Sequence, residues 1–443
     1  MTTGPQMSPQ AGADRRDLPF LDPRIAAVSV VLQLVLALFF GHLIDTRVNM
    51  AAGYLVATGQ NPYVPQDLST VFGSGLFRDF STIGYPPPWP LALGLIYKSV
   101  YAVFPNLLAY NLAIKLPIVA ANICLAYLVA FLLATRGASA RAAKGAWLFM
   151  LLNPFVLYAS AAWGQIDSIV ALASLLSLTL LYKGRLVASA SLLALGICLK
   201  PVALPLAIVA FVYVAGRGRR SFAQYTGVFA AGTVLLCVVP FAIFHWNPSI
   251  VLCNWNVHST VGGCMSYMTF WELFTGSVAL VGPWRLAGFA WVAALALFAV
   301  GLHRGIAGLP GLISSGAAAM LVFLLSRSWM SEPNFLVVLP FLVILAFTGA
   351  IGKRVLHAMW ILAMVFSVFN ASAVLLFFPS MPKVMDALLV TAAQYRAPLL
   401  IARSAVVVPW LVLGWRVVVI CVTKKPATAR AHGPVPEGMT PWT

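Results

Sequence analysis

The sequence predicts an all-α polytopic membrane protein, and three observations support this fold class. Hydrophobic residues make up 61% of its 443 positions, and charged residues only 9%. Apolar runs of roughly 20 residues, the length of a helix that crosses a bilayer, recur along the chain. Most charged residues fall between these runs. A soluble domain does not have this composition.

The apolar runs predict about twelve transmembrane helices. The first run, 25–44, is longer than the hydrophobic region of a signal peptide and is expected to remain as an uncleaved span. The other expected spans are 107–134, 145–162, 166–182, 186–200, 201–216, 226–244, 286–302, 308–326, 334–351, 355–378 and 400–421. The apolar stretch from Pro90 to Phe104 is expected to lie at the membrane surface or to re-enter it, since a full crossing would reverse the later loops.

Basic residues predict the orientation of these spans. The net charge of +17 sits largely in short loops and tails, which is typical of cytoplasmic loops and does not indicate nucleic-acid binding. One topology places every basic cluster inside: Arg15/Arg16/Arg24, Arg136/Arg141/Lys144, Lys183/Arg185, Arg217/Arg219/Arg220, Arg304, Lys353/Arg354 and Lys424/Lys425/Arg430. The chain is then a transmembrane domain, 25–422, between two disordered cytoplasmic tails, 1–24 and 423–443.

Carboxylates outside the tails fall on the opposite, extracytoplasmic side in this topology. They are Asp45, Asp67, Asp79, Asp167, Glu272, Glu332 and Asp386. The usual charge bias of loops explains part of this asymmetry, but carboxylates at helix ends cost desolvation unless something uses them. We therefore expect a catalytic or ligand site at the outer surface.

The first external loop, 45–89, is the longest polar segment between spans. Apolar residues at helical spacing from Arg47 to Thr58 predict a short helix on the membrane, with Asp45 capping its start. Three consecutive prolines near Trp89 predict an extended segment. The alternative for Asp45 is a solvated N-cap carboxylate without catalytic function.

These residues resemble a known family. The Asp45 loop is similar, spacing included, to the first lumenal loop of the GT-C superfamily of polyprenyl-phosphate-sugar glycosyltransferases. It is most similar to the mannosyltransferase family that adds the first mannose to glycosylphosphatidylinositol. Three later segments resemble successive signatures of that family in the same order, which is more specific than any single motif. They are LLNPFVLYASAAWGQIDSI (151–169), LYKGRLVASASLLALGICLKP (181–201) and SEPNFLVVLPFLVI (331–344).

The resemblance implies an inverting transfer of a hexose, mannose in this family, from a polyprenyl-phosphate donor. The acceptor would be a lipid-linked or cell-envelope molecule at the outer face. Asp45 carries over as the general base. Relatives often have two aspartates separated by one residue, whereas this chain has Leu43-Ile44-Asp45. A divalent metal would lack its first carboxylate here, so no cofactor is expected.

Basic residues on the external side are candidates for binding the donor phosphate, because cations stabilise the charge that develops on a leaving phosphate. These candidates are Lys200, Arg327, Arg285 and His258. Lys200 also matches a lysine of the resembling family. The alternative is a side chain that snorkels to lipid headgroups, or for His258 a solvated loop histidine.

A further group of residues could bind the sugar or the acceptor. They are Asp79, Tyr85, Trp163, Gln165, Asp167 and Glu332. An aromatic face beside an amide, as at Trp163 and Gln165, suits a sugar ring, although tryptophan is also common at membrane interfaces without a ligand. Asp167 and Glu332 have helix-start positions, so capping is their alternative.

Several alternatives stay open. Cys253 and Cys264 share the second external loop, 245–284, where a disulfide and two free thiols are both compatible with the sequence. No glycine-rich nucleotide loop is present, so a soluble nucleotide-sugar donor is not expected. A secondary transporter or a flippase of a lipid-linked sugar would share the composition, but transporters usually place charges at the bilayer midplane. The composition favours a prokaryotic plasma membrane over the endoplasmic reticulum.

Overall fold

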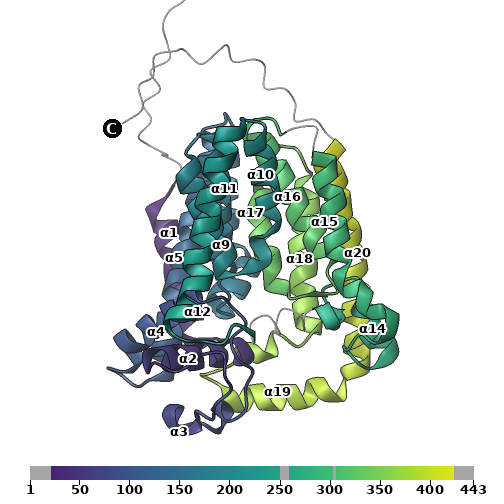
Figure 1. Ribbon diagram of the computed structural model, residues 1–443. Helices are drawn as coiled ribbons and strands as arrows, with labels where there is room; N and C mark the ends of the chain where they lie inside the picture. The colour runs from purple at the N-terminus through teal and green to yellow at the C-terminus, as the bar shows by residue number, and fades with distance from the viewer. Residues whose placement is uncertain (1–20, 250–258, 303–305, 424–443) are drawn as a thin grey trace, which may run out of the picture.

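A computed structural model describes residues 21–249, 259–302 and 306–423. Long helices stand side by side as a bundle, and shorter helices gather at one end (Figure 1). The bundle begins with α1 and ends with α20 at the upper end of Figure 1, while α2, α3, α4, α12, α14 and α19 lie at the lower end. We use "lower end" in this sense throughout.

The bundle consists of long and medium-length helices, and short elements connect them. The bundle helices are α1 (Pro23–Phe39), α5 (Leu107–Ala134), α6 (Ala140–Leu152), α8 (Asp167–Tyr182), α9 (Leu186–Leu199), α10 (Pro205–Ala215), α11 (Arg219–Thr233), α15 (Ala290–Gly301), α16 (Gly308–Ser326), α17 (Phe335–Phe347), α18 (Lys353–Phe369) and α20 (Arg396–Thr423). Shorter α-helices are α2 (Leu43–Ala57), α3 (Ser69–Phe72), α4 (Pro88–Ile96), α7 (Pro154–Leu157), α12 (Val239–Ile243), α14 (Thr269–Thr275) and α19 (Pro382–Gln394).

Tighter and wider helical turns and two short strands complete the described chain. The 3₁₀ turns are η1 (Gly75–Phe77), η4 (Pro201–Ala203), η6 (Gly282–Phe289), η8 (Glu332–Asn334) and η9 (Val374–Leu376). The π turns are η2 (Tyr97–Tyr101), η3 (Tyr158–Ala162) and η5 (Val234–Val238). The strands are β1 (Gly263–Cys264) and β2 (Trp329–Met330), which pair in parallel, with Gly263 opposite Trp329.

Six continuous helical segments in the described residues are long and apolar enough to cross a membrane: Leu107–Ala134, Ala140–Ala162, Arg219–Ile243, Gly282–Gly301, Gly308–Ser326 and Arg396–Thr423. Shorter apolar helices of 10–17 residues pack beside them: Pro23–Phe39, Asp167–Tyr182, Leu186–Leu199, Pro205–Ala215 and Glu332–Phe347. Two of these segments bury few of their residues. In the most apolar 18-residue stretch of Arg219–Ile243 only 6% of the residues are buried, and in that of Gly282–Gly301 only 11%, so both segments present apolar side chains outward. The protein is a multi-pass integral membrane protein.

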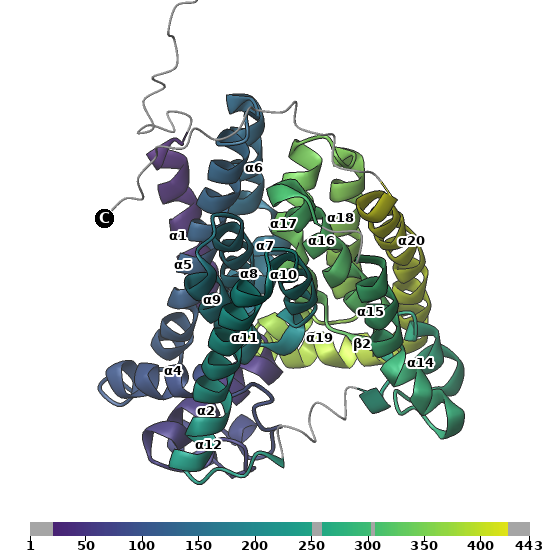
Figure 2. The ribbon, with the colours of Figure 1, turned by 45° about the horizontal axis from the view of Figure 1, so that its top comes forward.

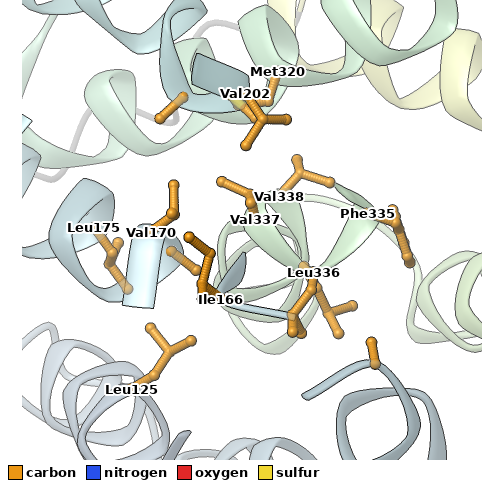
Figure 3. Close-up of a cluster of buried hydrophobic side chains, with 14 of the residues drawn as sticks. Leu125, Ile166, Val170, Leu175, Val202, Met320, Phe335, Leu336, Val337 and Val338 are labelled. Carbon is orange, nitrogen blue, oxygen red and sulfur yellow. The ribbon is translucent and has the colours of Figure 1, made fainter. Parts of the chain in front are cut away.

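The centre of the bundle is α17, which is apolar on every face. All residues from Phe335 to Ala346 are buried, as expected for a helix without a polar side. Figure 3 shows Phe335 and its neighbours on α17 among Leu125 of α5, Val170 of α8 and Met320 of α16. This packing places the start of α17, and η8 before it, at a fixed point of the lower end.

A buried polar network joins α1, α5, η3 and α8. Asn122 donates to Gln33 Oε1 and to Ser160 Oγ, each at 2.7 Å, and accepts from Ser168 Oγ at 2.5 Å. Gln33 donates to Ser29 Oγ at 3.0 Å. Since a polar group left unpaired inside a membrane protein is costly, this network fixes the four elements relative to one another.

Two side chains of α5 hold the lower end of α1. Asn111 Nδ2 donates to the carbonyl groups of Ala37 (2.7 Å) and Phe40 (2.8 Å). Lys115, one helical turn further, is buried and donates to the carbonyl groups of Phe40 and Ala162. The last carbonyls of a helix have no partners within the helix, so these donors stabilise the end of α1 at this point.

The expected first span, 25–44, is therefore wrong at its end. α1 stops at Phe39, and α2 starts at Leu43 after a short extended segment. Asp45 is also not the N-cap of the surface helix: His42 holds that position, and Asp45 lies inside the first turn of α2. The break is hard to see in the sequence because apolar residues, Phe40 before it and Leu43 and Ile44 after it, flank Gly41 and His42.

Other expected ranges differ from the structure in their bounds. The expected span 145–162 lies within the helical segment Ala140–Ala162, in which Asn153 ends α6 and its side chain caps α7 at Pro154. The expected helix 355–378 ends at Phe369. The expected helix 226–244 begins earlier, at Arg219. The stretch 90–104 forms most of α4 and η2 at the lower end, outside the upright bundle (Figures 1 and 2).

The structure adds elements that the sequence patterns did not predict. α19 lies across the lower end of the bundle (Figures 1 and 2). The β1–β2 pair joins Gly263 and Cys264 to the segment that follows α16, and Ser266 reinforces it by donating to the Ser328 carbonyl at 2.6 Å. Of the two cysteines in the expected external loop, Cys253 lies outside the described residues and Cys264 is described.

Replacing Asn122 by Ala tests the buried network. The change removes three hydrogen bonds inside the bundle, and at typical values for membrane proteins we expect a loss of about 2 kcal/mol in the free energy of unfolding. Reversible unfolding in mixed detergent micelles measures this loss. Cys124→Ala, on the exposed side of the same helix, is the matched control. Equal stability of the two variants would contradict a structural role for the network.

Candidate functional site

A cavity of about 680 Å³ opens at the lower end of the bundle. Residues that follow the ends of bundle helices or lie between them provide most of its charged and polar lining: His42, Asp45, Tyr85, Trp163, Gln165, Lys200, Arg327, Glu332, Asn334, Asn370 and Ser372. Its apolar lining includes Ile44, Val202, Leu204, Trp291, Phe323 and Leu375. Helix ends collect polar groups here because the chain leaves the apolar bundle at this level.

Asp45 is held by two neighbours on the same oxygen. Trp163 Nε1 donates to Asp45 Oδ2 at 2.6 Å, and His42 Nδ1 lies 3.0 Å from that oxygen. The rings of His42 and Trp163 stack with centroids 4.1 Å apart and planes 7° from parallel. Oδ1 has no partner among the described residues, and the side chain is 31% exposed. One carboxylate oxygen is thus fixed, while the other is left for a ligand in the cavity.

The surroundings of Asp45 keep it ionised. Burial by itself raises the pKa of Asp45, but the hydrogen bond and charge of His42, the Trp163 N–H and the charge of Lys200 outweigh this effect. The net result is a pKa below the ordinary value of an aspartate. At neutral pH the group is a carboxylate that can accept a proton.

A second cluster surrounds Lys200, between α9 and η4. Lys200 Nζ lies 2.7 Å from Asp167 Oδ2 and 3.0 Å from Gln165 Oε1. Asp167 is fully buried, and its Oδ1 has no partner in the described chain. Tyr85 donates its hydroxyl to Gln165 Oε1 at 3.0 Å, and Lys200 Nζ lies 5.7 Å from the centre of the Tyr85 ring. Asp167 therefore neutralises most of the charge of Lys200.

Tyr85 is a neutral donor in this cluster. Burial raises the pKa of Tyr85 well above its usual value, and the negative charges of Asp45 and Asp167 add to the rise. The phenol therefore keeps its proton at any physiological pH.

Arg327 is a cation of the lining that forms no salt bridge with a carboxylate of the described residues. Its guanidinium lies 5.2 Å from the centre of the Phe323 ring. Burial lowers the pKa of Arg327 to about 10, so the group still carries its charge at neutral pH. A partly dehydrated cation without a counter-ion favours the binding of an anion.

Glu332 is the centre of a third cluster in the cavity lining. It is the first residue of η8, directly before α17. It is 1% exposed and accepts from Asn370 Nδ2 at 3.0 Å and Ser372 Oγ at 2.9 Å. The Cys264 sulfur lies 3.9 Å from its other oxygen. Burial raises the pKa of the Cys264 thiol well above its usual value, and the charge of Glu332 raises it further. Glu332 is thus surrounded by neutral donors.

The structure brings most of the sequence candidates to this one cavity. Asp45, Tyr85, Trp163, Gln165, Lys200, Arg327 and Glu332 line it, and Asp167 contacts Lys200 directly. Two candidates lie elsewhere: Asp79 is exposed outside the lining, and Arg285 is exposed and donates to the Leu280 carbonyl at 3.3 Å. His258 lies outside the described residues.

Sequence reasoning missed several residues of the lining, among them His42, Asn334, Asn370 and Ser372. His42 sits inside an apolar run that was assigned to the first span, so a polar residue there was the available signal. Asn370 was placed inside the expected span 355–378, where an asparagine also signals a helix end. In the described ranges, no group of three or more His, Cys, Asp or Glu side chains is arranged to hold a metal ion.

No protein-family model matches the chain, and no curated protein matches it. Among solved structures, the chain is similar to the crystal structure of ArnT from Cupriavidus metallidurans bound to undecaprenyl phosphate. The identity is 16% and the TM-score 0.48, and the match covers 90% of this chain and 76% of the ArnT chain. At that identity and score the likeness does not assign a reaction to this protein.

Replacing Lys200 by Met tests the second cluster. The variant leaves the fully buried Asp167 without its cation, and we expect a loss of about 3 kcal/mol in the free energy of unfolding. Adding Asp167→Asn should restore more than half of that loss, because the uncompensated charge is then gone. Thermal unfolding of the purified protein measures both effects, with Lys144→Met, an exposed lysine elsewhere, as the control. A double variant no more stable than Lys200→Met would contradict the pairing.

Proposed function

We propose that the protein is a GT-C-like inverting glycosyltransferase with about twelve spans. It would move a hexose from a polyprenyl-phosphate donor to a lipid-linked or cell-envelope acceptor. The observation that carries this proposal is that the ionised Asp45 and Arg327 line the same cavity, and that among the described residues one oxygen of Asp45 has no partner and Arg327 has no carboxylate. A base and a phosphate-binding cation are the two groups that the reaction requires.

In the proposed reaction, Asp45 takes the proton of the acceptor hydroxyl. The acceptor oxygen forms a bond to the anomeric carbon, and the bond from that carbon to the phosphate oxygen breaks on the opposite face of the sugar. The released polyprenyl phosphate carries away the negative charge that develops, and Arg327 stabilises it, with Lys200 adding the smaller contribution of a paired cation. The anomeric configuration is inverted.

The remaining lining supports a lipid-linked sugar. Trp291, Phe323 and Leu204 provide an apolar side that suits the first isoprene units of the donor. Gln165, Asn370 and Ser372 offer amide and hydroxyl groups that suit sugar hydroxyls, and Glu332 accepts from two of these side chains. Mannose as the sugar, and the outer face of a prokaryotic plasma membrane as the location, follow from the resemblance and the charge pattern of the sequence.

The position of the charges favours an enzyme over a transporter. Asp45, Asp167, Lys200 and Glu332 all lie at or next to the lower-end cavity, beyond the ends of several bundle helices. A transporter that alternates its access usually holds its ionisable residues near the middle of the membrane.

Asp45→Asn tests the proposal directly. We expect the rate of transfer of radiolabelled mannose from polyprenyl-phosphate mannose to endogenous membrane lipid to fall by about 10³-fold, because the base is lost. Asp67→Asn, in the same expected loop, is the control and should keep wild-type activity, because Asp67 is exposed, accepts hydrogen bonds from Ser69 and forms an ion pair with Arg78 at 3.8 Å. Equal rates for the two variants would exclude Asp45 as the base. A chelator should leave the wild-type rate unchanged.

The pH dependence of transfer is a separate test of how Asp45 is held. Because the pKa of Asp45 is lowered, activity should fall on the acid side only below the ordinary pKa of an aspartate. Trp163→Phe keeps the aromatic ring against His42 but removes the N–H donor. The pKa of Asp45 should then rise, and the acid limb of kcat/KM should move to higher pH. An unchanged limb would show that Trp163 does not hold the base.

A further inference from the structure

A second, smaller cavity lies at the lower end, away from Asp45. It measures about 270 Å³ and is formed by α14, α18, α19 and α20. Its charged and polar lining consists of Glu272, Arg396, Arg403 and Asn370. The remaining lining is apolar, mainly leucine and alanine side chains of α19 and α20. The mechanism proposed above makes no use of this cavity.

One carboxylate in this cavity faces two guanidinium groups. Arg403 is 9% exposed and pairs through Nη2 with Glu272 Oε2. Its Nη1 donates to Asn370 Oδ1 at 2.5 Å, while its Nε is buried without a partner in the described residues. Arg396 Nη2 lies 3.8 Å from Glu272 Oε1, with a side chain that is 65% exposed. The cavity therefore carries an excess of one positive charge and a buried N–H donor without an acceptor.

Exposed apolar side chains lie on the helices that form the cavity. α20 is one of the helices long and apolar enough to cross a membrane, and α19 lies across its lower end (Figure 1). Val390, Tyr395 and Ile401, on these two helices, are 61%, 59% and 58% exposed. Apolar side chains are therefore exposed on α19, on α20 and at the junction between them. This is the arrangement that a ligand with an anionic head and hydrocarbon chains requires.

We propose that this cavity binds the phosphodiester headgroup of a membrane glycerophospholipid. Arg396 would pair with the phosphate oxygens, the positive charge of Arg403 would add to the attraction, and the acyl chains would lie along the exposed apolar side chains of α19 and α20. A phosphodiester carries one negative charge, which matches the excess charge of the cavity. The volume admits a headgroup but is well under half that of the cavity at Asp45.

The lipid site and the larger cavity share one side chain. Asn370 lines both cavities, accepts from Arg403 and donates to Glu332 at 3.0 Å. The two sites are therefore separate in their ligands but adjacent in space. Binding of the phospholipid does not depend on sugar transfer, so its test needs no assay of activity.

Native mass spectrometry of the full-length protein, stripped of lipid by detergent exchange, tests this site. We expect wild type to retain one tightly bound phosphatidylglycerol and not a diacylglycerol with the same chains. Arg396→Gln should weaken phosphatidylglycerol binding about tenfold, the value of one charge-assisted hydrogen bond. Lys383→Gln removes the same charge from an exposed position of α19 outside the cavity lining, and should change binding less than twofold.

The controls separate the possible sources of phosphate. Inorganic phosphate at millimolar concentration should not displace the bound phosphatidylglycerol; displacement would show a site for free phosphate and overturn the proposal. Equal binding of diacylglycerol would show an apolar groove without headgroup recognition. Equal effects of Arg396→Gln and Lys383→Gln would show only general attraction of lipid to positive charge, and would also overturn it. Because Arg396 is largely exposed, its replacement leaves the buried Arg403–Glu272 pair in place.

Discussion

The lower end of α1 is held by Asn111 and Lys115 of α5, and the position of Asp45 depends on these hydrogen bonds. The last carbonyl groups of a helix need donors from elsewhere, and few are available inside an apolar bundle. Asn111 and Lys115 supply them, so the chain leaves the helix at Phe40 and starts α2 at Leu43. Lys115 also donates to Ala162, next to Trp163, which brings the partner of Asp45 to the same place. Gly164 follows with φ +94°, and a Cβ there would lie 2.8 Å from Lys115 Cε, so the close approach requires glycine.

The chemistry of the larger cavity follows from how its charges are paired. Trp163 and His42 occupy one oxygen of Asp45, Asp167 neutralises Lys200, and neutral donors surround Glu332. Arg327 is the cation that these pairs leave without a carboxylate in the described structure. In a partly dehydrated space such a cation attracts an anion strongly, while the ionised Asp45 is available to take a proton. The same cavity can therefore hold a phosphate and activate a hydroxyl.

Sequence patterns predicted the helical membrane fold and much of the site, because both depend on local composition. The WGQID segment and the lysine before Pro201 were recognisable as helix ends with polar side chains, and the structure places them together. The end of α1 was not predictable from the run 25–44, since it depends on donors from α5. Asp45, the expected base, and Asp79, a weaker candidate for binding the acceptor, belong to the same expected loop, but only Asp45 lines the cavity. Arg403 was hidden in the apolar run of α20, and its pairing with Glu272 is visible only in three dimensions.

A structure of the protein in lipid nanodiscs with bound polyprenyl phosphate would test most directly whether this cavity holds the donor. We expect the phosphate at the lower end of the bundle, within salt-bridge distance of Arg327, with the first isoprene units against Phe323 and Trp291. The unpartnered oxygen of Asp45 should face the open space beside the phosphate, where a sugar would lie. A phosphate bound outside this cavity, or at the opposite end of the bundle, would contradict the assignment of the site.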